Sequence, residues 1–129
     1  MSNKTIEQLF SLENRIAVVT GGCGLLARQF NTILAEAGTT IITLDLNSSA
    51  NYSIDITKEE EVKECFIDIE KTHGSLDIII NNASLNPVPG IELTENHFSP
   101  YEYYPKELWD KELSVNLTGA MLITQEGIK

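Results

Sequence analysis

Residues 15–27 read Arg-Ile-Ala-Val-Val-Thr-Gly-Gly-Cys-Gly-Leu-Leu-Ala, and this stretch decides the fold. Residues 15–20 form a short apolar run that ends at glycines, which is typical of a parallel strand buried on both faces. A helical pattern of apolar residues then runs from Leu25 to Ala37 and is closed by Gly38. A strand, a glycine-rich turn and a helix in this order predict a turn that can receive a phosphate group.

The rest of the chain continues the alternation of strand and helix. Three further apolar runs predict strands, at residues 39–45, 52–56 and 76–81. Between the last two, Thr57-Lys-Glu-Glu60 predicts a capping box that opens a helix, whose apolar face comprises Val62, Cys65, Phe66 and Ile69. Pro105 suits the first turn of a last helix.

This alternation predicts an α/β fold with right-handed crossovers. We expect a Rossmann-type doubly wound parallel sheet of strand order 3-2-1-4, truncated to about four strands plus flanking helices. Residues 1–129 would form a single domain of this type.

Composition restricts the class of protein further. Apolar residues make up 42% and charged residues 22% of the 129, and the formal net charge is −10. Such a charge argues against a nucleic-acid partner, and no apolar run is long enough to span a bilayer. Two cysteines and two histidines show no ligand spacing, so we expect no metal site. With no signal-peptide pattern at the N-terminus, we expect a soluble cytoplasmic protein.

Two features of the predicted turn point to a dinucleotide. Gly21 and Gly24 would let the backbone approach a pyrophosphate, and Asp45 ends the second strand, where its carboxylate can accept hydrogen bonds from ribose hydroxyls. The same carboxylate would repel a 2′-phosphate, and no Arg or Lys follows it before Lys58. NAD is therefore favoured over NADP. A tight strand-to-helix turn that binds no ligand is the alternative for the glycines alone.

Four motifs in order resemble those of the short-chain dehydrogenase/reductase family, over about residues 12–129. Thr20-Gly-Gly-Cys-Gly is similar to its cofactor turn, and Asp55-Ile56 resembles its adenine-contacting pair. Asn81-Asn-Ala-Ser84 resembles its Asn-Asn-Ala-Gly motif, and Trp109-Asp-Lys-Glu-Leu-Ser-Val-Asn-Leu-Thr-Gly119 is close to its fifth-helix signature.

The resemblance implies an NAD(P)-dependent oxidoreductase that transfers a hydride between an alcohol and a carbonyl. Asn116 would be the first member of an Asn-Ser-Tyr-Lys catalytic tetrad, its backbone holding a water of the proton relay. Asn81 would also tie adjacent strands together. The last helix would pack against its counterpart in a homo-oligomer. The cofactor-binding residues would be Gly21, Cys23, Gly24, Leu25, Leu26, Asp45, Leu46, Asp55, Ile56, Asn81, Asn82, Ala83 and Ser84.

The sequence also departs from the family's pattern. Leu25 or Ala27 stands where the family usually has glycine, and Ser84 replaces another glycine. No Tyr-x-x-x-Lys occurs, so we expect a fragment, a truncated polypeptide or half of a split gene, inactive by itself. A non-catalytic dinucleotide-binding fragment is the alternative. A Rossmann-like methyltransferase is disfavoured by the Asn-Asn-Ala-Ser and Val-Asn-Leu-Thr-Gly motifs.

The stretch of residues 85–104 is longer than its counterpart in the family. It carries three prolines and, near its end, several aromatic residues. Two interpretations remain open: a loop that faces a small-molecule substrate, or aromatic packing over the last helix. The stretch resembles members of the family that act on sugars or sugar acids.

Overall fold

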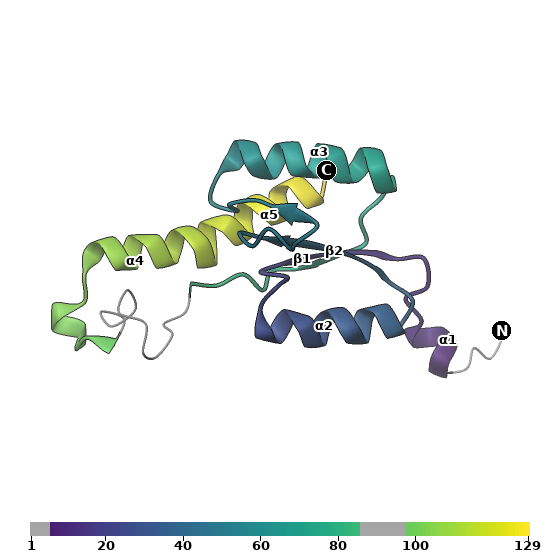
Figure 1. Ribbon diagram of the computed structural model, residues 1–129, viewed down its shortest axis with the longest axis horizontal. Coiled ribbons are helices and arrows are strands. Elements are labelled where there is room, and N and C mark those ends of the chain that lie inside the picture. The colour runs from purple at the N-terminus through teal and green to yellow at the C-terminus, as the bar shows by residue number, and fades with distance from the viewer. Residues whose placement is uncertain (1–5, 86–97) are drawn as a thin grey trace.

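The computed structural model describes residues 6–85 and 98–129. It contains a four-stranded, fully parallel sheet of order β3-β2-β1-β4, which confirms the predicted fold class and strand order. Helices α3 and α5 cover one face of this sheet, while α2 covers the other and α1 lies beside the end of α2 (Figure 1). The strands are β1 (Ile16–Thr20), β2 (Thr40–Asp45), β3 (Tyr52–Ser53) and β4 (Ile78–Ile80).

The helices alternate with these strands along the chain. The first three are α1 (Ile6–Phe10), α2 (Leu25–Glu36) and α3 (Glu59–His73). A short 3-10 helix, η2 (Tyr101–Tyr103), precedes α4 (Lys106–Leu113), a π-helical segment η3 (Ser114–Gly119) and α5 (Ala120–Gly127). Among the described residues, no helix is long and apolar enough to cross a membrane.

Strand β1 is buried on both faces, as its apolar run predicts. Val18 packs in the main core with β2 residues and with α3 and α5, whereas Ala17 and Val19, which point the other way, have no exposed surface either. The predicted apolar face of α3 is also confirmed, because its four residues Val62, Cys65, Phe66 and Ile69 are all buried. The sheet is therefore held between two helical layers.

The predicted capping box is wrong. Helix α3 begins at Glu59 with Lys58 as its N-cap, and no side chain caps it. Thr57 instead donates its backbone N–H and its hydroxyl to one oxygen of Asp55, at 2.9 and 2.7 Å. Three acidic residues, Glu59 to Glu61, stand in the first turn, where their charge is favourable to the helix dipole.

The third and fourth strands are shorter than predicted. Strand β3 ends at Ser53 rather than at residue 56 because the backbone N–H of Asp55 turns to the Glu61 carboxylate, at 2.8 Å, and leaves the sheet. Strand β4 spans only the three isoleucines of residues 78–80, within the predicted range of 76–81.

The last helix begins directly after Pro105, as predicted, but it is not one regular helix. The π-helical segment η3 interrupts it, and the Ser114 hydroxyl donates to the Lys111 carbonyl at 2.7 Å where this segment begins. Gly119 ends the segment against Ile56, and a Cβ there would lie 2.7 Å from Ile56 Cδ1. The helix can therefore pass close to the chain between β3 and α3.

Residues 86–97 of the long stretch 85–104 lie outside the described residues, so its interpretation as a substrate-facing loop stays a prediction. The aromatic side chains at its end are described. Phe98, Tyr101 and Tyr103 are 61, 84 and 75% exposed. Tyr104, in contrast, is partly buried, and its side chain is hydrogen-bonded to Glu112 of α4, so the interpretation as aromatic packing over the last helix also stays open.

Candidate functional site

A cavity of about 650 Å³ lies at the carboxyl edge of the sheet, where β1, β2 and β4 end. This is the edge at which open α/β sheets bind their ligands. Most of the residues expected from the sequence line it: Gly21, Gly24, Leu25, Leu26, Asp45, Leu46, Asp55, Ile56, Asn82, Ala83 and Ser84. Cys23, Asn81 and Asn116 do not line it.

The glycine-rich turn forms one end of the cavity. Gly21 has a left-handed backbone (φ +60°), and a Cβ there would lie 2.9 Å from Ala83 Cα, so only glycine fits without a shift. Gly24 is the N-cap of α2. Because glycine has no side chain, no N-cap side chain accepts a hydrogen bond from the N–H groups of the first helical turn. These groups and the helix dipole suit an anion at this end.

The Thr20 hydroxyl joins the turn to the loop that follows β4. Its oxygen accepts the backbone N–H groups of Asn82 and Ala83, each at 3.0 Å, and donates to the Ile80 carbonyl at 3.4 Å. The Asn82 side-chain amide donates in return to the carbonyls of Thr20 and Gly21, at 3.0 and 3.1 Å. The two loops are thus locked together.

The expectation that Asn81 ties adjacent strands together is wrong, because Asn82 forms that tie. The Asn81 amide points to the other side and donates to the Thr124 hydroxyl of α5, at 3.0 Å. The two asparagines follow each other where the chain leaves a strand, so their side chains point in opposite directions. The motif itself does not indicate which of the two faces β1.

Asp45 lies at the end of β2 with both carboxylate oxygens engaged. One oxygen accepts the backbone N–H of Cys23, and the other accepts that of Asn47, both at 3.0 Å. The Cys23 sulfur lies 3.4 Å from the Ser49 hydroxyl. Cys23 therefore holds the carboxylate against the glycine-rich turn, and its side chain closes the gap to the loop after β2.

Asp55 is the second fixed carboxylate of the cavity. Burial acts to raise its pKa, but the two hydrogen bonds from Thr57 and the charge of Lys58 outweigh burial and lower the pKa below its usual value. The group is therefore ionised at neutral pH. Asp45 and Asp55 together give the cavity two hydrogen-bond acceptors of negative charge.

Asn116 lies within the π-helical segment η3, away from the cavity surface. Its side-chain oxygen accepts the backbone N–H of Leu85 at 2.8 Å, which joins η3 to the loop after β4. Ser84 and Leu85 of that loop line the cavity. The side chain therefore supports the cavity floor, while the relay role implied for its backbone stays a prediction.

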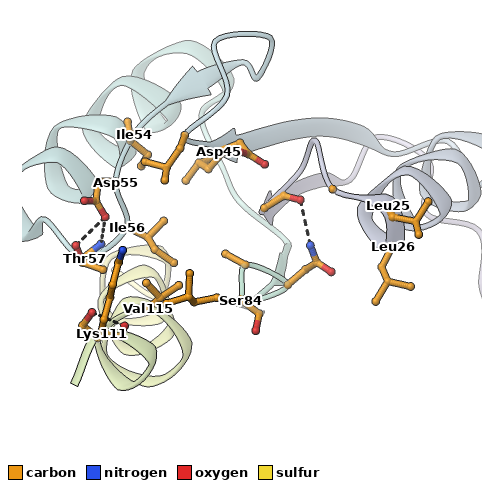
Figure 2. A pocket seen from close by; sticks show the side chains of 18 residues that line it. Leu25, Leu26, Asp45, Ile54, Asp55, Ile56, Thr57, Ser84, Lys111 and Val115 are labelled. Carbon is orange, nitrogen blue, oxygen red and sulfur yellow. Dashed lines mark hydrogen bonds between the residues drawn. The ribbon is translucent and has the colours of Figure 1, made fainter. Parts of the chain in front are cut away.

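Sequence reasoning missed several residues that line the cavity: Leu44, Ile54, Thr57, Leu85, Lys111, Ser114 and Val115. Figure 2 shows Lys111 and Val115 on the side of the cavity where the Asp55–Thr57 loop lies. The available signal was helical spacing, since Lys111, Ser114 and Val115 follow one another at i, i+3 and i+4 just before Asn116. Among the described residues, no group of three or more His, Cys, Asp or Glu could hold a metal ion.

The sequence is similar to that of known oxidoreductases. A family model described as short chain dehydrogenase matches residues 15–129. The short chain dehydrogenase/reductase dpfgG of Gibberella zeae is 31% identical, over 95% of this chain and 47% of its own length. The NAD-dependent glycerol dehydrogenase of Listeria innocua is 27% identical, over 97% and 50%. The chain thus spans about half the length of these relatives.

Solved structures agree with this assignment. An NAD⁺-bound xylitol dehydrogenase superposes with a TM-score of 0.78 at 26% identity, over 89% of this chain and 47% of that protein. An NADPH-dependent 3-quinuclidinone reductase from Rhodotorula rubra superposes with a TM-score of 0.76 at 27% identity, over 98% and 50%. Similar proteins therefore use either NAD or NADP.

The Thr20 hydroxyl generates a prediction about stability. Thr20→Val keeps the shape of this buried side chain but leaves the N–H groups of Asn82 and Ala83 without their acceptor, so we expect a loss of about 1–3 kcal/mol in unfolding free energy. Thr20→Ser keeps the oxygen and loses one methyl group, and should cost about 1 kcal/mol. Urea denaturation measures both, and a valine variant as stable as the serine variant would contradict this role.

Proposed function

Since the chain belongs to the short-chain dehydrogenase family, we propose that it forms the NAD-binding part of an oxidoreductase that moves a hydride between an alcohol and a carbonyl. The observation that carries the proposal is the cavity at the carboxyl edge of the sheet. The glycine-rich turn and the start of α2 lie at one end of this cavity, Asp45 is hydrogen-bonded to that turn, and Asp55 lies at the other end. An anionic pyrophosphate fits the first end, and an adenosine fits the second.

The choice of NAD over NADP rests on Asp45. Its carboxylate is held by two backbone N–H groups at the end of β2, where it can accept hydrogen bonds from the ribose hydroxyls. A 2′-phosphate in that place would meet a negative charge. The family does not decide the matter, because similar proteins include both NAD- and NADPH-dependent ones.

Small polyhydroxylated molecules are the substrate class that we propose. The NAD-dependent glycerol dehydrogenase and the NAD⁺-bound xylitol dehydrogenase are both named for polyols. A sugar or sugar acid offers the same secondary alcohol for hydride transfer. This part of the proposal rests on the relatives' names and on the length of residues 85–104, not on a contact within the cavity.

Removing the Asp45 charge tests the cofactor preference. We expect the unaltered protein to bind NADH more tightly than NADPH, and Asp45→Asn to narrow that ratio about tenfold, because the repulsion of the 2′-phosphate is lost. Calorimetric titration with both cofactors measures the ratio. Asp110→Asn, which neutralises an exposed carboxylate on α4, is the control and should leave it unchanged. Tighter binding of NADPH by the unaltered protein would contradict the preference.

The 129-residue chain by itself should bind NADH without catalysing turnover. It holds Asn116 but no Tyr-x-x-x-Lys, and loss of a general acid/base typically lowers rates by about 10²- to 10⁴-fold. The absorbance of NADH measures the rate, as NADH formed from NAD⁺ with glycerol or xylitol, or as NADH consumed with their ketone counterparts. The second candidate function is dinucleotide binding without catalysis. It is favoured because the sequence contains no Tyr-x-x-x-Lys. Turnover above that of a mock preparation would refute both expectations.

An apolar stripe on the last helix supports a further proposal, that the protein forms a homo-oligomer. Trp109, Leu113, Leu117 and Met121 recur at every fourth position and are 39–65% exposed. Residues at this spacing lie on one side of a helix. Exposed apolar stripes of this kind commonly mark protein interfaces.

A charge placed in the stripe tests this association. Sedimentation velocity at micromolar concentration should show a dimer or larger species, and Leu117→Glu should shift it towards the monomer because a buried carboxylate would be unpaired. Ile33→Glu, at a comparably exposed position on α2, is the control and should leave the species unchanged. A monomer at all concentrations up to about 100 µM would rule out the proposal.

A further inference from the structure

We infer that Lys111 is an additional cofactor-contacting residue, which covers the adenine base and donates a hydrogen bond to one of its ring nitrogens. This inference rests on the proposed function, since it places a dinucleotide in the cavity. Lys111 lies within the stretch Trp109 to Gly119 that resembles the fifth-helix signature, but the resemblance gives it no role, and it comes from a helix whose other exposed face is apolar. It lines the cavity together with Ser114 and Val115.

Helical geometry explains why Lys111 reaches the cavity. Lys111, Ser114 and Val115 share one side of the helix, because residues three and four apart are neighbours. Trp109 and Leu113 each lie two positions from Lys111, which places them about 200° away on a helix of 3.6 residues per turn. The exposed apolar stripe and the cavity wall are therefore opposite faces of the same helix.

The ammonium group of Lys111 has no partner among the described residues. Glu107 stands one turn earlier, the spacing at which glutamate and lysine commonly pair, yet residues 6–85 and 98–129 contain no ion pair or side-chain hydrogen bond of Lys111. Its neighbour Lys106 does pair at this spacing, with Asp110. The ammonium group of Lys111 is thus available to a ligand.

The cavity supplies a reason for a cation at this place. Its charged lining residues in the described chain are Asp45, Asp55 and Lys111. Both carboxylates accept backbone or hydroxyl hydrogen bonds. Lys111 therefore supplies the positive charge among these lining residues. The whole chain carries a net charge of −10. One lysine therefore offsets the negative charge that an approaching dinucleotide would meet.

The position of Lys111 selects the base rather than a phosphate. Figure 2 shows it beside the Asp55–Thr57 loop, on the far side of the cavity from Leu25 and Leu26, which begin α2 directly after the glycine-rich turn. The Asp55-Ile56 pair resembles the family's adenine contact. The adenine ring offers acceptor nitrogens at its edge and an apolar face, which suit an ammonium group on a four-carbon stem beside Val115.

Binding experiments with Lys111→Met test this inference. Methionine keeps the length and apolar character of the stem and removes the charge. We expect the dissociation constant for NADH to rise about three- to tenfold, as one partly exposed, charge-assisted hydrogen bond would give. AMP, measured as a competitor of NADH, should weaken by the same factor because it contains the same base. Lys106→Met, five residues earlier and paired with Asp110, is the matched control and should bind both NADH and AMP as the unaltered protein does.

Each other outcome has a distinct meaning. If the unaltered protein binds neither NADH nor AMP, the proposed function itself fails. If it binds both and Lys111→Met binds them equally well, the inference about Lys111 is wrong and the proposed function stands. A loss for NADPH much larger than that for NADH would show a phosphate contact and would also overturn the inference. Equal melting temperatures of the two variants would exclude a change in the fold, since both side chains are exposed.

Discussion

The hydroxyl of Thr20 is the contact on which the site depends. It stands at the end of the central strand, is almost completely buried, and accepts two backbone N–H groups from the loop that follows β4. The Asn82 side chain closes the same junction from the other direction. Parallel strands pair along their length, but the loops beyond them have no ladder to hold them. These side-chain bonds take over where the sheet ends, and so keep the cavity floor and the glycine-rich turn in register.

That junction also explains the glycine requirement. Because the loop after β4 is pulled against the turn, Ala83 lies where a side chain on residue 21 would need to be, and Gly22 faces Thr43 just as closely. This close packing of backbone on backbone places the start of α2 at the cavity. Asp45 then fixes the opposite side of the turn through the N–H of Cys23. The site is thus assembled before any ligand arrives, which lowers the entropic cost of binding.

Local sequence patterns predicted the strands, their order, the buried face of α3 and most of the residues around the cavity. Their failures share one cause, competition from partners that the local pattern does not contain. Thr57 has the spacing of a capping residue, but Asp55 is nearer and takes both of its donors. Residue 55 has a strand-like neighbourhood, but Glu61 captures its N–H. The exchange of roles between Asn81 and Asn82 depends on Thr20, 62 positions before Asn82. Lys111 was missed because only the folded chain brings α4 to the Asp55–Thr57 loop.

The last helix contributes both to the cavity wall and to the apolar surface that would meet another subunit. In a regular helix the cavity face and the apolar stripe would keep a constant angular separation along its length. The π-helical segment η3 changes the phase between α4 and α5, and within it Asn116 turns to the loop after β4 while Leu117 stays exposed. A displacement of this helix would therefore move Lys111, Val115 and the Leu85 contact together. Contacts made on its outer side would act on the same helix that forms the cavity wall, so packing of the stripe against another subunit would be coupled to binding in the cavity.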